Sequence, residues 1–127
     1  MTFVDTNVFM YAVGRSHPLR GPARRFFEES VEDPARALCT SAEVLQELLH
    51  AYLPVGRLDT LDAALTLARG TMREIWPVEP DDVDIARALV DEHPELGARD
   101  LLHLACCRRR GVKRVQTYDR GLAAAFG

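Results

Sequence analysis

The segment that decides the fold is Thr2-Phe3-Val4-Asp5-Thr6-Asn7, near the start of the 127-residue chain. Its first three residues form a short apolar run that predicts a buried strand. Its last three residues carry oxygen-bearing side chains, whereas capping the next helix needs only one of them. The segment therefore predicts a strand that brings polar groups to its carboxyl end.

Three more short apolar segments predict strands, at residues 37–40, 75–78 and 113–117. Helical patterns separate them; the helices are predicted at residues 8–13, 19–32 (or from 22), 42–53, 57–72, 80–92 with Val83 and Leu89 inward, 98–110, and from Asp119 to 125. This alternation is typical of parallel strands joined by crossover helices. We predict one α/β sandwich with about four parallel strands, in a single domain spanning residues 1–127. Pro77 favours an edge position for the third strand.

The bulk composition excludes several classes of protein. The net charge of −3 excludes a general nucleic-acid coat, although two local basic clusters could contact phosphates or simply be solvated. These clusters are Arg20, Arg24 and Arg25, and Arg108, Arg109, Arg110, Lys113 and Arg114. We expect no signal peptide and no membrane span, since no apolar run approaches ~20 residues. We expect a cytoplasmic protein with Cys39, Cys106 and Cys107 as buried free thiols.

Four carboxylates stand where strands end or helices begin, namely Asp5, Glu47, Asp100 and Asp119. Open α/β sheets bind ligands at the carboxyl ends of their strands. Four acids converging there would repel one another unless a cation lay among them. Hard oxygen ligands select Mg²⁺ or Mn²⁺, and these ions indicate phosphate chemistry.

Each acid taken singly has a structural alternative. Asp5 and Asp119 could cap helices, and the helix dipole favours Asp100 in a first turn. Glu43 and Glu47 share one helix face, and spacing separates them only weakly. His50 and His103 lack partners at zinc-ligand spacing, which favours supporting or surface roles.

Four segments, read together, resemble the PIN-domain ribonucleases, and within them the VapC-type toxins of bacterial toxin–antitoxin pairs. They are Phe3-Val4-Asp5-Thr6-Asn7-Val8-Phe9-Met10-Tyr11-Ala12, Thr40-Ser41-Ala42-Glu43-Val44-Leu45-Gln46-Glu47, Ala98-Arg99-Asp100-Leu101-Leu102-His103 and Thr117-Tyr118-Asp119-Arg120-Gly121. Each motif is short, and only the set is specific. The set covers almost the whole chain in the family's order.

The resemblance implies a PIN-like three-layer α/β/α sandwich with a short parallel sheet. It implies that Asp5, Glu47, Asp100 and Asp119 form a catalytic, metal-binding quartet, and it favours Glu47 over Glu43. Asn7 and Thr117 match supporting polar positions, and Arg99 is a supporting candidate by adjacency alone. The implied activity is Mg²⁺-dependent cleavage of RNA, with a cognate antitoxin and a homodimer as partners.

Two other functions fit the same residues in part. The acids could form a non-catalytic interaction module that binds a basic partner peptide, because the same charges would serve that role. A magnesium-dependent phosphatase usually has a second acid two residues after its nucleophilic Asp. Position 7 is Asn, which weighs against a phosphatase.

Overall fold

The computed structural model describes every residue from Met1 to Gly127. Strands and helices alternate as predicted, in the order β1 (Thr2–Val4), α1 (Thr6–Val13), α2 (Arg20–Glu32), β2 (Leu38–Ser41), α3 (Ala42–Tyr52), α4 (Leu58–Thr71), β3 (Glu74–Trp76), α5 (Pro80–Leu89), α6 (Ala98–Arg109), β4 (Arg114–Gln116) and α7 (Arg120–Ala125). All four predicted strands are present, and each helix lies within a few residues of its predicted position.

The four strands form one parallel sheet in the order β3-β2-β1-β4. Phe3 on β1 is in register with Cys39 on β2 and with Val115 on β4. Strand β3 lies at the edge, as Pro77 predicted, because a proline directly after the strand is best tolerated there. The first predicted strand is therefore central, with a neighbour on each side.

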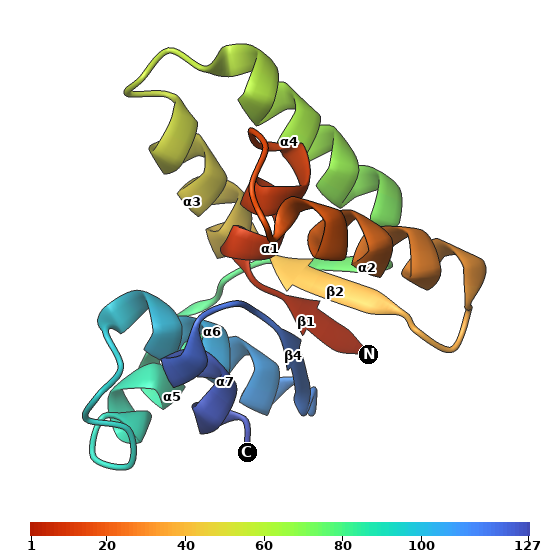
Figure 1. The fold of residues 1–127 in the computed structure, drawn as a ribbon. Helices are drawn as coiled ribbons and strands as arrows, with labels where there is room; N and C mark the ends of the chain where they lie inside the picture. The colour runs from red at the N-terminus through yellow and green to blue at the C-terminus, as the bar shows by residue number, and fades with distance from the viewer.

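Helices cover both faces of the sheet (Figure 1). Helices α1 to α4 lie on one side and α5 to α7 on the other, which confirms the three-layer α/β/α prediction. Phe3 and Val4 are fully buried, and neighbouring strand residues point to opposite faces, so β1 is covered on both sides. All three cysteines are free and buried, as predicted.

Helix α5 differs most from its prediction. It ends at Leu89 instead of residue 92, and Val83, predicted to be inward, is 54% exposed. The buried residue beside it is Asp82, which hydrophobic periodicity cannot identify as a core position. Helix α1 starts at Thr6, two residues earlier than predicted, because the Asp5 side chain accepts a hydrogen bond from the Thr6 amide.

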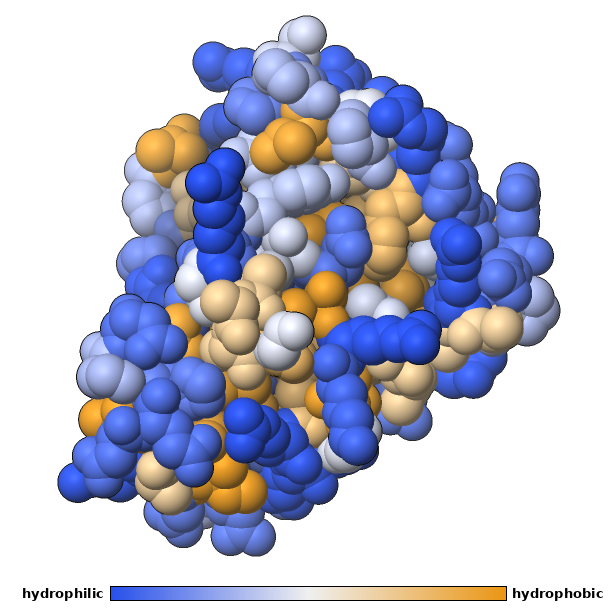
Figure 2. Space-filling view, turned by 60° about the horizontal axis from the view of Figure 1, so that its bottom comes forward, coloured by the Kyte–Doolittle hydropathy of each residue, from blue (hydrophilic) through white to orange (hydrophobic).

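On the face seen in Figure 2, hydrophilic side chains cover most of the rim and hydrophobic ones appear mainly in the middle. Large exposed apolar side chains gather around the connection from α3 to α4, at Leu49, Leu53, Val55 and Leu58. None of the helices combines the length and the apolar composition needed to cross a bilayer.

Candidate active site

The carboxyl ends of β1 and β4 define the position of the site. Strands β2 and β3 lie on one side of β1 and β4 lies on the other, so the strand order reverses between β1 and β4. Open α/β sheets form their ligand crevice at such a point, because the loops after the two strands diverge. Asp5 follows β1 and Thr117 follows β4, and the Asp5 amide donates to the Gln116 carbonyl at 3.0 Å.

A hydrogen-bond network joins these two strand ends. The Thr117 hydroxyl donates to Asp5 Oδ2 at 2.7 Å and accepts from Asn7 Nδ2 at 3.3 Å. The same hydroxyl oxygen accepts from the Asp119 amide at 3.0 Å, and Asn7 Oδ1 accepts from the Tyr118 amide at 3.2 Å. Asn7 and Thr117 thus fix the Asp5 carboxylate against the loop that carries Asp119.

The capping roles considered for Asp5 and Asp119 are both present. Asp5 Oδ1 accepts from the Thr6 amide at 2.8 Å at the start of α1. Asp119 Oδ1 accepts from the Leu122 amide at 3.1 Å at the start of α7. Each cap uses one carboxylate oxygen, so the structural role of these acids leaves their second oxygen for other contacts.

Glu47 reaches the same centre from α3 and contacts His103 on α6. Glu47 Oε1 lies 2.5 Å from His103 Nε2, and that nitrogen is 3.8 Å from Asp5 Oδ1. The His103 side chain is 1% exposed and its ring centroid lies 5.5 Å from that of Phe3. His103 therefore has a supporting position inside the site. Glu47, rather than Glu43 in the first turn of α3, makes this contact.

The charges of the four acids act on one another. Burial raises the pKa of Asp100, and the negative charges of Asp119, Asp5 and Glu47 raise it further. Burial alone would lower the pKa of His103, but the contact with Glu47 and the charges of Asp5 and Asp100 raise it instead. Four carboxyl groups therefore act on one another at this centre, with a single buried imidazole beside them.

The donor set of the site decides whether it suits a divalent metal ion. No three His, Cys, Asp or Glu side chains are grouped closely enough to hold a metal ion in this arrangement. The side chains are engaged with protein groups: Asp5 with Thr117, Glu47 with His103, and Asp119 with its helix amide. Glu47 Oε1 is nevertheless buried without a regular hydrogen bond. Carboxylate oxygens in an unneutralised acidic centre fit a hard cation.

The basic residues that the sequence suggested as contacts for the site or for phosphates lie in different environments. Arg99, the supporting candidate, is exposed, and the basic side chain beside Asp5 and Glu47 is His103 instead. Arg109 and Arg110 do not form part of a free basic patch, because both bind the buried carboxylate of Asp82. The sequence gives no sign of this pairing, because Asp82 on α5 and the two arginines at the end of α6 are 27 and 28 positions apart.

Comparisons with known proteins agree with this fold. The PIN domain model matches residues 2–126. Ribonuclease VapC23 of Mycobacterium tuberculosis is 68% identical over 126 residues, covering 99% of this chain and 98% of the relative. Ribonuclease VapC13 of the same species is 38% identical over 121 residues, covering 95% and 92%. The crystal structure of M. tuberculosis VapC20, a "Sarcin-Ricin loop cleaving toxin", matches with TM-score 0.82 and 22% identity, covering 98% and 95% of the chains, and shows the shared fold.

Proposed function

Because the chain belongs to the PIN-domain family and to its VapC-type ribonucleases, as its motifs predicted, we propose that it is an Mg²⁺-dependent endoribonuclease. In this proposal it hydrolyses RNA phosphodiester bonds as the toxin of a type II toxin–antitoxin pair. Residues 1–127 act as one domain, and the cytoplasm, where RNA is abundant, is the site of action.

The observation that carries the proposal is the mutual effect of four carboxylates from distant parts of the chain. Asp100 on α6 has a raised pKa because burial and the charges of Asp119, Asp5 and Glu47 all disfavour its ionised form. Perturbed carboxyl groups of this kind cluster at functional sites. A protein gains no stability from placing these acids together, so a cation or a reaction must account for them.

Asp5, Glu47, Asp100 and Asp119 are the proposed metal-binding and catalytic residues. They would hold Mg²⁺, with Mn²⁺ as a substitute, once their side chains turn from their protein partners toward a shared centre. A bound divalent cation supplies positive charge that polarises the scissile phosphate and activates the attacking water.

The remaining residues of the site position these acids. The Thr117 hydroxyl, itself held by Asn7, orients Asp5 at the end of β1. His103, which is buried on α6, holds Glu47 at the same centre. Since the acids themselves repel phosphate, the phosphates on either side of the cut need cationic side chains outside the acidic centre.

We also propose the partners that the family resemblance implies, a cognate antitoxin and a second copy of this chain. The exposed apolar side chains between α3 and α4, at Leu49, Leu53, Val55 and Leu58, support a protein partner. Such side chains on a small domain mark interaction surfaces when they lie together. Co-purification of this chain with the protein of the neighbouring reading frame tests whether the antitoxin is the partner.

The test of the proposed activity is cleavage of a labelled structured RNA in Mg²⁺, with and without a chelator. Asp5→Asn and Asp100→Asn should each lower the rate by more than about a hundredfold while the fold survives. Asp84→Asn is the matched control, because Asp84 is exposed on α5. Full activity in either site variant would end the assignment. Binding of a basic peptide without any RNA cleavage would instead favour the non-catalytic interaction module.

A further inference from the structure

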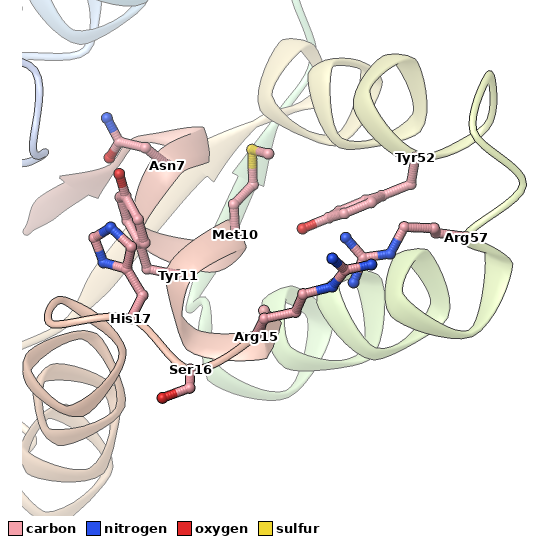
Figure 3. A pocket seen from close by; sticks show the side chains of 9 residues that line it. Asn7, Met10, Tyr11, Arg15, Ser16, His17, Tyr52 and Arg57 are labelled. Carbon is pink, nitrogen blue, oxygen red and sulfur yellow. The ribbon is translucent and has the colours of Figure 1, made fainter.

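A recess opens at the end of α1, and one of the residues that line it is Asn7 of the acidic centre (Figure 3). It has a volume of about 340 Å³, within the range of small-ligand pockets. The side chains that matter here are Asn7, Tyr11, Arg15, His17, Tyr52 and Arg57. They come from α1, the loop after it, the end of α3 and the residue before α4.

The turn after α1 creates this recess. At Gly14 an added Cβ would lie 2.7 Å from the Met10 carbonyl oxygen, closer than real Cβ atoms approach backbone atoms. Only glycine allows the chain to turn this tightly against the helix it has just left. The turn brings Arg15 and His17 back alongside Tyr11.

Two guanidinium groups in the recess have no carboxylate partner. The arginines in ion pairs are Arg36, Arg108, Arg109 and Arg110, and neither Arg15 nor Arg57 is among them. In Figure 3 the Arg15 and Arg57 guanidinium groups point toward one another near the Tyr52 hydroxyl. Two facing positive charges without a counterion form a site for an anion such as phosphate.

Flat rings lie beside these charges. The Tyr11 and His17 rings are 4.6 Å apart between centroids, and His17 is exposed. The Arg57 guanidinium lies 5.6 Å from the centroid of the Tyr52 ring. Aromatic rings and guanidinium planes are the surfaces on which unpaired RNA bases stack.

The recess and the acidic centre share one residue. Asn7 lines the recess and donates to Thr117, whose hydroxyl holds Asp5. Tyr11 also packs edge-on against Tyr118, at 5.4 Å between ring centroids, and Tyr118 precedes Asp119. The recess is therefore next to the residues that position Asp5 and to the residue that precedes Asp119.

We infer that this recess binds one unpaired nucleotide next to the cut, with its phosphate at Arg15 and Arg57 and its base against Tyr11 and His17. The inference rests on the proposed ribonuclease function and specifies its substrate as RNA with an unpaired nucleotide at the cut. RNA accounts for both the charges and the rings, whereas an acidic peptide would need only the charges.

The test measures binding, so that it does not depend on cleavage. The Kd of a fluorescent hairpin RNA with an unpaired loop is measured in the Asp100→Asn background, over a range of salt concentrations. Adding Arg15→Gln should weaken binding about tenfold and reduce the slope of log Kd against log salt by about one. Arg15→Lys should keep most of the salt slope. Arg87→Gln, an exposed arginine on α5, should change neither quantity.

A second arm tests the base. His17→Ala should weaken binding of the loop RNA by about tenfold, but not binding of the same RNA with an abasic site beside the mapped cut. A fully paired duplex of the same sequence should bind the parent and His17→Ala equally. Equal effects of His17→Ala on the intact and abasic RNAs would overturn the stacking assignment.

Arg15→Gln values equal to those of Arg87→Gln would overturn the inference. So would unchanged RNA binding together with weaker binding of a Glu-rich peptide, because the recess would then be a peptide site. These results are separate from failure of the proposed function, which would be absence of Mg²⁺-dependent RNA cleavage by the parent protein.

Discussion

Asp82 and Asp100 are both removed at least in part from solvent, but they differ in the charges that surround them. Asp82 on α5 is fully buried, and Arg109 and Arg110, at the end of α6, bind its carboxylate at 2.7 and 2.9 Å. Burial alone would raise the pKa of Asp82, but the two arginines and the Glu79 amide hold it well below its usual range. Burial and three other acids, in contrast, raise the pKa of Asp100.

The difference separates an acid that stabilises the fold from the acids to which we assign the proposed catalytic role. Asp82 joins α5 to α6, and its arginine Arg110 also stacks on Trp76 at 4.8 Å and donates to the Pro77 carbonyl. Its charge is fully balanced within the protein. The charges around Asp100 are left unbalanced, and this is the state a cation site requires before its ion binds.

The largest effect on stability should come from removing the charge of Asp82 between its two arginines. Asp82→Asn leaves two arginines beside a neutral buried amide, and we expect a loss of about 3 kcal/mol in the free energy of unfolding. Urea denaturation measures this value. Asp84→Asn on the same helix is exposed and should change it by less than about 0.5 kcal/mol. Equal stability of the two variants would remove the distinction drawn for Asp82.

The opposite sign is expected at the unbalanced centre. Asp100→Asn removes one of several repelling charges, and we expect the metal-free protein to gain roughly 1 kcal/mol. The α6 dipole favours an acid in the first turn by about 0.3–1 kcal/mol, which reduces the gain. Urea denaturation in a chelator gives the answer. A clear loss of stability would mean that the neighbouring acids do not repel Asp100.

The two acids should also respond oppositely to pH. A lowered folded-state pKa means that Asp82 stabilises the protein above the ordinary value of 3.8, and that this contribution is lost as the pH falls below it. The raised pKa of Asp100 costs stability as the pH rises from 3.8 through its folded-state value. Melting curves in chelator should lose their acid-side fall in Asp82→Asn and keep it in Asp100→Asn. An unchanged loss of melting temperature at acid pH in Asp82→Asn would contradict the role given to Asp82.

The smallest effect is expected for Glu43. It lies half-buried in the first turn of α3, whereas Glu47 contacts His103 within the acidic centre. Glu43→Gln should therefore leave the rate of RNA cleavage within about twofold and the stability within about 0.5 kcal/mol. Glu47→Gln is the matched comparison and should lower the rate strongly. A larger effect at Glu43 would reverse the choice between the two.

Much of the fold could be predicted from local patterns. Residues close together in the sequence determine three features: the strand at Thr2–Val4, the Ser41 cap of α3 and the edge position of β3. Asp82 could not be found this way, because only the packing of α5 on α6 shows that its arginines are near. The prediction that Val83 points inward is wrong for the same reason, because hydrophobic periodicity detects apolar residues and cannot detect a buried ion pair at the next position.

The sequence motifs predicted which residues make up the site, but not how their side chains contact one another. The motifs indicated which acids belong together, and the raised pKa of Asp100 agrees with four charges acting at one place. The motifs gave no sign that His103 contacts Glu47, because the two lie on separate helices. The recess with Arg15 and Arg57 was equally hidden, since it forms only when the loop after α1 meets the start of α4.

The most direct test is the melting temperature of the parent and of Asp5→Asn, each in chelator and in Mg²⁺. An ion shared by the acids stabilises the folded state, by about 2.7 kcal/mol at a concentration of 100 times Kd. Mg²⁺ should therefore raise the melting temperature of the parent, and the rise should vanish in Asp5→Asn. No rise in the parent, or an equal rise in both proteins, would contradict a common cation at these side chains.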